Sequence, residues 1–207
     1  LHTAIDVLWV AGERQRQFAS RLGYTGKHCW DGEYACDWSR FAEVYSESES
    51  SEGNEFLFLG RYAPEKGIDV LMDAYARYRE EAENPWPLRC AGAGPKKARI
   101  GETDGVIDHG FTQPDDVPAL MRKASAFVLP SRSEPWGVVV QEAAAAGLPL
   151  ICTEASGAAV HLLRDGYNGL LVQPENVGHL SEALRRMSAF EGTKREEMGR
   201  RSHELSK

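Results

Sequence analysis

The sequence contains no long run of apolar residues. A membrane-spanning helix needs about 20 consecutive apolar residues, and no stretch of the 207 residues approaches that length. The first residues also lack the charged start, apolar core and cleavage site of a secretory signal. We therefore expect a protein without a transmembrane segment that acts in the cytoplasm.

Cysteine is scarce, and its spacing excludes the common metal and redox motifs. The four cysteines, Cys29, Cys36, Cys90 and Cys152, form no CxxC pair. Cys90 and Cys152 lie inside apolar runs, where a thiol behaves as a small hydrophobic group. The six histidines show no HxxxH or Cys/His spacing of a zinc site. We expect reduced thiols and no bound metal.

Blocks of lysine or arginine are absent as well. The formal net charge is -7, whereas nucleic-acid-binding domains usually carry a basic face, so no nucleic acid is expected as a partner. The GxSxG elbow of many hydrolases and the P-loop of many NTPases are also missing. These absences remove support for both classes of enzyme.

From residue 54 onward, short apolar runs alternate with helical patterns. Short continuous apolar strands between amphipathic helices indicate a parallel sheet covered on both faces. We predict an α/β fold with a Rossmann-like, doubly wound parallel sheet over residues 54–190 and a C-terminal helix over residues 191–207. The expected strands are 55–60, 88–91, 105–109, 126–130, 150–153 and 170–172, and the expected helices are 68–81, 116–124, 138–146 and 177–189.

The first 45 residues have a different pattern. A strand is expected over residues 6–12, a helix over 13–22 and a loop over 34–41. One βα unit cannot bury its own faces, so it must dock on the main domain or belong to a domain that is absent. Residues 46–53 are serine and glutamate followed by glycine, which predicts an exposed acidic loop or linker.

The segment from Ser131 to Glu142 is the most informative. It reads as a strand end, a turn and a helix start, with Glu134 on the loop and Glu142 eight positions later on the helix. In an open α/β sheet such a loop lies at the carboxyl end of a strand, where these folds bind ligands. Backbone N–H groups near Gly137 and Val138 can contact an anion. The segment predicts a sugar-nucleotide site.

The loop that joins the first strand to the first helix carries two cations. Gly60 lets backbone approach a ligand, while Arg61 and Lys66 flank a helix start whose dipole favours negative charge. These features predict a diphosphate clamp opposite the segment of Glu134. The alternative is a pair of ordinary solvated side chains.

Two further loops follow the next strands. Residues 91–95, Ala-Gly-Ala-Gly-Pro, lack the third glycine of a dinucleotide fingerprint and predict a tight turn beside a ligand. Gly110 and Phe111 end the third strand, where backbone groups and a ring can hold a nucleobase. The alternative is that Phe111 is an ordinary core residue.

Taken in order, these segments resemble the carboxyl-terminal half of the family-4 retaining glycosyltransferases, which have the GT-B fold. The interdomain linker of that family also has a counterpart here, which assigns residues 1–33 to the end of an amino-terminal domain. The similar segments are the linker (34–41), the diphosphate loop (60–67), the AGxGP turn (91–95), the base loop (110–111), the E-x7-E motif (134–142) and the DGxNGxLV strand (165–172).

The resemblance implies a role for each site residue. Arg61 and Lys66 would bind the donor diphosphate, and Glu142 would bind the ribose hydroxyls. Glu134 would contact the transferred sugar and stabilise positive charge at its anomeric carbon. The predicted donor-binding residues are Gly60, Arg61, Lys66, Gly110, Phe111, Trp136, Gly137, Val138 and Glu142, and Glu134 is the predicted catalytic residue.

The activity implied by the resemblance is transfer of a hexose, with retention, from a UDP- or GDP-linked sugar to an acceptor hydroxyl. It needs no cofactor and no metal, so cationic side chains must neutralise the leaving diphosphate. The second expected partner is the amino-terminal domain of the same enzyme, with its acceptor pocket. Because a closed two-domain cleft orients the acceptor and excludes water, we expect this chain alone to bind donor weakly and transfer nothing.

Two other interpretations stay open. One is another GT-B enzyme, such as a sugar-nucleotide 2-epimerase, although the E-x7-E spacing and the Arg61/Lys66 loop favour transfer. The other is a catalytically silent module that binds a nucleotide sugar. The sequence also departs from the family at the Gly-Gly-x-x-Glu stretch, which appears here as Ser156-Gly157-Ala158-Ala159-Val160-His161 and contains no glutamate.

Overall fold

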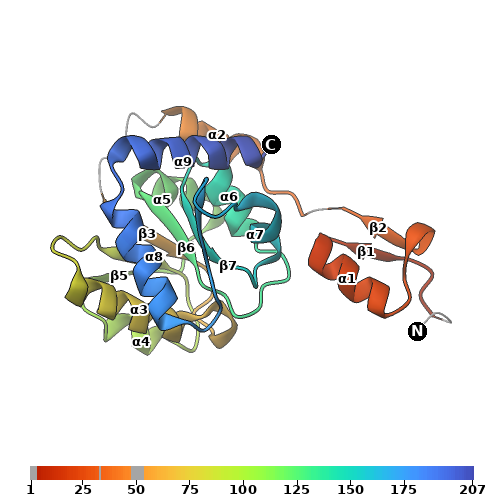
Figure 1. The fold of residues 1–207 in the computed structure, drawn as a ribbon, viewed down its shortest axis with the longest axis horizontal. Helices are drawn as coiled ribbons and strands as arrows, with labels where there is room; N and C mark the ends of the chain where they lie inside the picture. Colours follow the sequence, from red (N-terminus) through yellow and green to blue (C-terminus); the bar gives the residue numbers. More distant parts are fainter. Residues whose placement is uncertain (1–3, 33, 48–53) are drawn as a thin grey trace.

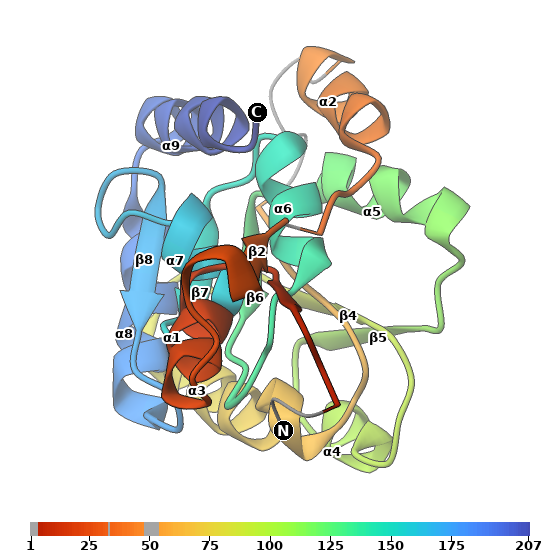
Figure 2. The same ribbon diagram turned by 90° about the vertical axis from the view of Figure 1, so that its right-hand side faces the viewer.

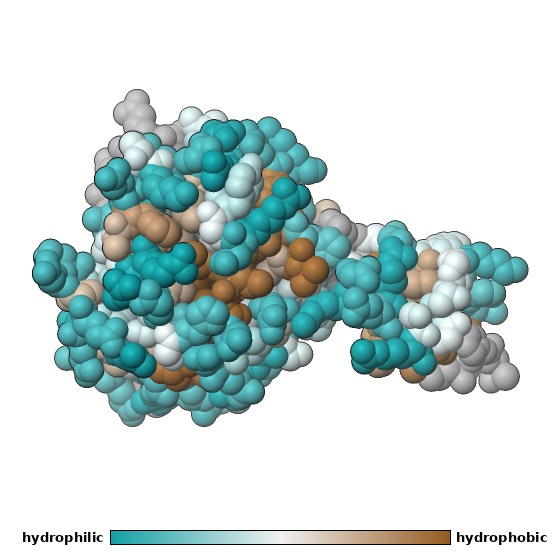
Figure 3. All heavy atoms as spheres, in the orientation of Figure 1, coloured by the Kyte–Doolittle hydropathy of each residue, from teal (hydrophilic) through white to brown (hydrophobic). Residues whose placement is uncertain are grey.

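A computed structural model describes residues 4–32, 34–47 and 54–207 of the chain. It has two unequal parts (Figure 1): a large sheet covered by helices, and a small amino-terminal unit that extends from one side. The face drawn in Figure 3 is mostly hydrophilic, and its apolar residues gather over the middle of the larger part.

The larger part is built on a parallel sheet of six strands. Their order in the sheet is β5-β4-β3-β6-β7-β8, and every neighbouring pair is parallel. This is the doubly wound order of Rossmann-like domains, so the predicted fold class is confirmed. The strands are β3 (Phe56–Leu59), β4 (Leu88–Ala91), β5 (Val106–Gly110), β6 (Ala126–Leu129), β7 (Leu150–Thr153) and β8 (Gly169–Val172).

Helices cover both faces of this sheet. Helices α3 and α8 pack together on one face, and α2, α5, α6 and α9 lie over the other (Figures 1 and 2). None of the described helices is long and apolar enough to cross a membrane. The helices are α2 (Trp38–Glu47), α3 (Ile68–Glu81), α4 (Lys97–Gly101), α5 (Val117–Lys123), α6 (Val138–Ala145), α7 (Gly157–Leu162), α8 (Val177–Ala189) and α9 (Gly192–Leu205).

Burial along the strands explains why this pattern folds as a covered sheet. In β3, the consecutive residues Phe56, Leu57 and Phe58 are all fully buried. Successive side chains of a strand point to opposite faces, so burial of all three requires cover on both sides. The core therefore lies in two layers, one between the sheet and each set of helices.

Several predicted elements have the observed bounds. Helices 68–81 and 177–189 and strands 88–91 and 150–153 agree at both ends, and the other predicted strands and helices of the main sheet differ by one residue at one or both ends. The C-terminal helix predicted for residues 191–207 is α9. The short helices α4 and α7 and the strand β2 (Cys29–Asp31) were not predicted.

The prediction of a loop over residues 34–41 is wrong in its second half. Helix α2 begins at Trp38 and continues through Ser46 and Glu47, which were predicted to start the acidic loop. Its residues Phe41 and Val44 are buried in the core of the larger part. This apolar stripe fixes the segment as a helix on the main sheet. The rest of the predicted loop, residues 48–53, lies outside the described residues.

The amino-terminal unit is a parallel βαβ unit. It comprises β1 (Leu8–Val10), α1 (Glu13–Arg21) and β2, and its own core is small. Trp9 and Trp30 are partners across the two strands, and their exposed fractions are 73% and 62%. A parallel pair of strands is normally covered on both faces. The unit thus leaves apolar surface exposed on its sheet.

Helix α9 packs closely against the end of α6 at one glycine, Gly199. Met198, Gly199, Ser202 and His203 form the buried face of the helix. A Cβ atom added at Gly199 would lie 2.1 Å from the carbonyl oxygen of Gly147. The absence of a side chain at Gly199 therefore sets how closely α9 approaches the end of α6.

We predict that Gly199→Ala lowers the free energy of unfolding by about 1–3 kcal/mol, because the methyl group forces α9 away from Gly147. Gly192→Ala is the matched control, since Gly192 lies on the same helix and has no atom within 4 Å of an added Cβ. Alanine is the better helix former, so the control is expected to be neutral or stabilising. Urea unfolding measures both, and equal changes would contradict this packing.

Candidate functional site

The predicted site lies between β3 and β6, where the order in which the strands are added to the sheet reverses. From β3 the chain moves outward through β4 and β5, and it then returns to the other side of β3 to form β6. Open α/β sheets bind ligands outside the carboxyl ends of the strands at such a switch point. Gly60 directly follows β3, and the loop of Glu134 follows β6. The topology therefore places both predicted loops at one crevice.

A groove of about 390 Å³ opens at this crevice. One wall comes from the end of β3 and the turn after it, and the other from the loop before α6 and the first turn of that helix. Six of the ten predicted site residues line it: Gly60, Lys66, Glu134, Trp136, Gly137 and Val138. Four residues that were not predicted also line it: Tyr34, Leu59, Pro135 and Val139.

Lys66 and Glu134 form an ion pair across this groove. Their side chains come from residues 68 positions apart and keep only 19% and 12% of their surface exposed. A buried charge needs a partner of opposite sign, and each of these side chains supplies the other's. The pair gives the groove a cation and a carboxylate side by side, which can face a phosphate and a sugar respectively.

A tight turn positions Lys66. The 3-10 helix η2 (Pro64–Lys66) ends at Gly67, which has a left-handed φ of 72° and begins α3. A Cβ atom added at Gly67 would lie 2.1 Å from the carbonyl oxygen of Pro130. The turn after β3 is thus pressed against the end of β6, and Lys66 faces the loop of Glu134.

The loop of Glu134 is itself held by the segment before α7. The Glu134 amide donates to the Ala155 carbonyl at 3.2 Å, and the Glu134 carbonyl accepts from the Gly157 amide at 3.0 Å. The Trp136 carbonyl accepts from the Ala158 amide at 2.7 Å. These bonds fix the backbone that carries the carboxylate.

Gly137 begins α6 in a left-handed conformation, with φ of 90°. A Cβ atom there would approach the Glu134 side chain to 3.0 Å and the Ser156 hydroxyl to 3.1 Å. No side chain caps this helix start, so amides of the first turn, including that of Val138, are free of intrahelical partners. Such amides suit a negatively charged ligand.

Arg61 does not line the groove. Its side chain is 68% exposed and pairs with Glu65 one turn further along. The pKa of Glu65 is lowered, first by a hydrogen bond from its own backbone amide and then by Arg61. The Glu65 carbonyl accepts from the Arg132 amide at 2.8 Å, which joins this turn to the chain after β6. Arg61 thus lies near the groove but is paired elsewhere.

Glu142 also lies outside the groove lining. It is on α6, one turn after Val138, and is partly buried beside residues from the linker segment. Burial raises the pKa of Glu142, and the charge of Arg40 opposes that shift. Burial and the charge of Glu142 in turn raise the pKa of Cys36 to about 11. The structure therefore places Glu142 in a half-buried position with a cation near it.

The predicted base loop is open. Gly110 has φ of 75° with no atom within 4 Å of an added Cβ, and Phe111 is 69% exposed. The alternative that Phe111 is a core residue is therefore wrong. Asp108 supports this loop by accepting from the Gly110 amide and from the Tyr62 hydroxyl, each at 2.9 Å. Sequence reasoning missed Asp108, whose position inside a strand gave no signal.

Tyr34 was missed as a groove residue for a different reason. It was assigned to the linker from its position before α2, and a linker pattern does not show which way a side chain points. In the structure Tyr34 lines the groove while remaining largely exposed.

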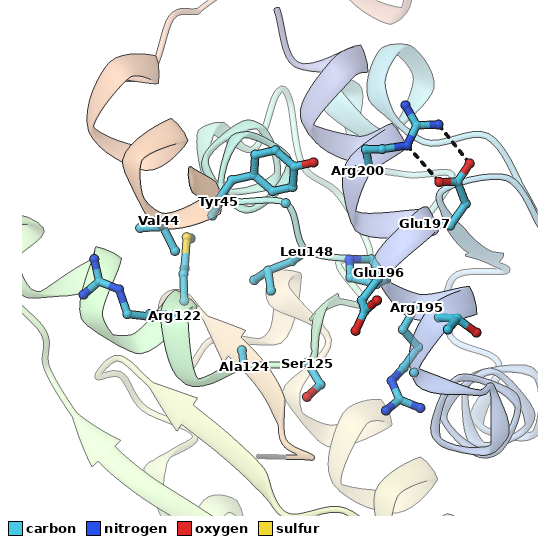
Figure 4. A pocket seen from close by; sticks show the side chains of 16 residues that line it. Val44, Tyr45, Arg122, Ala124, Ser125, Leu148, Arg195, Glu196, Glu197 and Arg200 are labelled. Atoms are coloured by element: carbon cyan, nitrogen blue, oxygen red, sulfur yellow. Dashed lines mark hydrogen bonds and ion pairs between the residues drawn. The ribbon is translucent and has the colours of Figure 1, made fainter. Parts of the chain in front are cut away.

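A larger hollow of about 730 Å³ lies elsewhere, between α2, α5 and α9 (Figure 4). It is at the amino ends of β6 and β7, opposite the carboxyl ends where this fold class binds ligands. Its Arg200 pairs with Glu197 and Glu204, and its Arg195 donates to the Asn54 side chain and lies over the Trp86 ring. These arginines are committed to the protein itself. The groove is the better candidate.

The described residues include no group of three or more His, Cys, Asp or Glu side chains that could hold a metal ion. The groove has its charge from Lys66 and Glu134 and its uncapped amides from the start of α6.

Comparison with known proteins agrees with this architecture. Residues 41–204 match the family model of glycosyl transferases group 1. The chain belongs to this family. Its sheet and covering helices match part of glycosyltransferase structures that have the GT-B fold. The resemblance to GT-B glycosyltransferases is thus confirmed.

Three similar proteins illustrate the match. An uncharacterized glycosyltransferase of Methanocaldococcus jannaschii is 33% identical over 168 residues, which cover 79% of this chain and 45% of the relative. A D-inositol 3-phosphate glycosyltransferase of Streptomyces bingchenggensis is 34% identical over 151 residues, which cover 66% and 33%. A variant of S. aureus TarM, solved with fondaparinux, α-GlcNAc-glycerol and UDP, has a TM-score of 0.83 at 16% identity and covers 98% of this chain and 41% of TarM. The chain spans less than half the length of each.

The raised pKa of Glu142 predicts a pH dependence of stability. A carboxyl whose folded pKa is raised contributes stability below its unfolded pKa, near 4.5, and loses that contribution as pH rises through the folded value. We therefore expect Glu142→Gln to become more stable relative to the natural chain as pH rises from roughly 4 to 8.

Glu182→Gln is the control with the opposite sign, because a hydrogen bond from Arg185 lowers the pKa of Glu182. Urea unfolding across this pH range measures both variants. A difference for Glu142→Gln that is flat or falls with pH would contradict the burial of that carboxyl.

Proposed function

We propose that this chain is the donor-binding half of a retaining glycosyltransferase, which moves a hexose from a nucleotide diphosphate sugar to an acceptor hydroxyl in the cytoplasm. The observation that carries the proposal is the Lys66–Glu134 ion pair in a groove at the switch point of the sheet. Membership of a glycosyltransferase family supports the reaction class. The UDP named in the TarM complex supports the kind of ligand.

The proposed chemistry follows from the charges at the groove. Breaking the bond between sugar and diphosphate leaves negative charge on the diphosphate and develops positive charge at the anomeric carbon. Lys66 and Arg61 neutralise the first, together with amides at Gly137 and Val138. Glu134 stabilises the second. The proposed reaction therefore needs no metal ion at this site.

Donor binding frees Glu134 in this proposal. Without ligand, Lys66 and Glu134 neutralise each other. An arriving diphosphate competes for the Lys66 ammonium, because a phosphate oxygen is also a charge-assisted acceptor. The carboxylate released by Lys66 then faces the sugar. The ion pair thus keeps the carboxylate in place until the donor arrives.

The nucleoside half of the donor is assigned to the remaining predicted residues. Glu142 accepts hydrogen bonds from the ribose hydroxyls, which offsets the cost of its partial burial. Gly110 leaves space beside the backbone, and the exposed ring of Phe111 offers a face on which a base can stack. These assignments extend the site from the groove toward the edge of the sheet.

We propose that the second partner is the amino-terminal domain of the same enzyme. The support is the exposed pair Trp9 and Trp30 on a sheet of only two strands. Two strands alone make a marginal sheet, and a larger sheet with helices on its face would cover these rings. That domain would carry the acceptor pocket, so this chain alone would bind donor and transfer nothing.

A catalytically silent nucleotide-sugar-binding module is the second candidate. The observation that favours it is the stretch of residues 156–161, which lacks the glutamate of the family pattern. Both candidates share the donor site, and they differ only in turnover.

We expect Arg61→Ala and Lys66→Ala to weaken UDP binding much more than uridine binding, because both cations act on the diphosphate. Loss of a charge-assisted hydrogen bond costs about 1.5–3 kcal/mol, or roughly 10- to 150-fold in affinity. Calorimetry on the 207-residue chain measures this.

Arg77→Ala is the matched control, since Arg77 pairs with Glu81 one turn along α3 just as Arg61 pairs with Glu65. The control is expected to bind both ligands normally. An equal loss for UDP and uridine in the Arg61 and Lys66 variants would overturn the assignment of the diphosphate.

In the enzyme with its amino-terminal domain, substitution of Glu142 and substitution of Glu134 are expected to change different kinetic constants. Glu142 acts on the ribose in ground and transition states alike, so Glu142→Gln mainly weakens donor binding. Glu134 acts where charge develops, so Glu134→Gln mainly lowers kcat. Steady-state kinetics separates the two effects. If both variants keep donor affinity and kcat within twofold, or roughly 0.4 kcal/mol, both roles are wrong.

A further inference from the structure

The amino-terminal unit contacts the loop of Glu134 directly. The Glu13 amide, at the start of α1, donates to His161 Nε2 on α7 at 3.3 Å. The side-chain amide of Gln15 donates to the Pro135 carbonyl. Figure 2 shows α1 in front of α7, and the two helices are in contact. The first turn of α1 therefore rests on the wall of the groove.

The contact is closely packed around a glycine. The rings of Trp136 and His161 lie with their centroids 5.4 Å apart. A Cβ atom added at Gly12 would lie 2.7 Å from His161 Nε2 and 2.8 Å from Trp136 Cζ3. The backbone of Gly12 is extended, a conformation that any residue can adopt. The contact therefore requires glycine for its lack of a side chain and not for its conformation.

The start of α1 depends on this contact. Gly12 has no side chain and cannot cap the helix, and no other side-chain cap from α1 is present. The first amides of a helix need acceptors from outside it, and His161 Nε2 accepts from the first one. His161 therefore caps α1 from the other part of the protein.

The loop is consequently held on two sides. Within the groove, Lys66 holds Glu134. On its other side, Gln15 of α1 donates to the Pro135 carbonyl, and Gly12 at the start of α1 packs on Trp136. Pro135 and Trp136 directly follow Glu134 in the chain. Glu134 directly precedes Pro135, whose ring fixes its own φ, so a shift of α1 reaches Glu134 through adjacent residues.

Two buried polar atoms show that the contact is not saturated. Trp136 Nε1 and Gln15 Oε1 have no hydrogen-bond partner in the part of the chain that the structure describes. An unsatisfied buried polar group is costly, so part of the gain from packing is offset.

We propose that His161 is a positioning residue that couples the placement of the βαβ unit to the loop of Glu134. It caps α1 and packs on Trp136 at once, so movement of the amino-terminal unit changes the position of the proposed sugar-side carboxylate. The inference rests on the proposed function only in the role given to Glu134. The coupling itself is a property of the ligand-free chain.

Amide hydrogen exchange followed by NMR tests the coupling. The reporters are the amides of Glu13, Glu134, Gly157 and Ala158, which bond across the contact or within the loop. His161→Ala is expected to speed their exchange by about fivefold or more, relative to Leu71 in α3. His161→Gln keeps an acceptor near the position of Nε2, so it is expected to restore exchange to within about twofold.

Gly12→Ala probes the same contact from the other side without altering the donor domain. Its methyl group separates α1 from His161 and Trp136, so the same four amides are expected to exchange faster. The proposal is overturned if Gly12→Ala has no effect on the loop amides, or if the glutamine variant behaves like the alanine variant. UDP binding to the unsubstituted chain is measured separately, so failure of the coupling and failure of the proposed function remain distinguishable.

Discussion

All six strands of the main sheet run in the same direction, and the site depends on this constraint. Parallel strands place their carboxyl ends at one edge, so the loops after β3, β5 and β6 meet there although they lie far apart in the sequence. The reversal of strand order between β3 and β6 opens the crevice between two of these loops. Lys66 and Glu134 face each other because of that topology, and the tight turn that ends at Gly67 directs Lys66 toward the loop of Glu134.

Close backbone contacts then determine the details of the groove. Gly67 lets the turn after β3 touch Pro130, and Gly137 leaves room for the Glu134 side chain. At both positions an added Cβ would displace a group that forms the ion pair or its support. The groove is therefore shaped by the absence of side chains at two glycines and charged by the side chains next to them. Its outer wall includes the contact with α1, which connects it to the amino-terminal unit.

The sequence predicted the sheet well because its signals are strong. Four-residue apolar strands and an apolar stripe such as Leu71, Ala74, Tyr75 and Tyr78 have few alternatives to a covered parallel sheet. Helix α2 was missed because its stripe of Phe41 and Val44 lies beside a polar segment that suggests a linker. Short elements such as β2 and α4 carry too few residues for a periodic signal.

The site could be predicted only as a set of loops. The sequence identified Lys66 and Glu134 separately, and their direct pairing follows from the fold. It gave no sign that Arg61 pairs with Glu65, that Glu142 is partly buried beside the linker segment, or that Tyr34 reaches the groove. Each of these depends on contacts between residues distant in sequence or on side-chain directions, which a linear motif does not encode.

A crystal structure of the chain with UDP is the sharpest test of the proposed donor site. We expect the diphosphate in the groove, with Lys66 on a phosphate oxygen and no longer on Glu134, and the ribose near Glu142. UDP bound in the hollow between α2, α5 and α9, or a Lys66–Glu134 pair left intact with the nucleotide bound elsewhere, would contradict it.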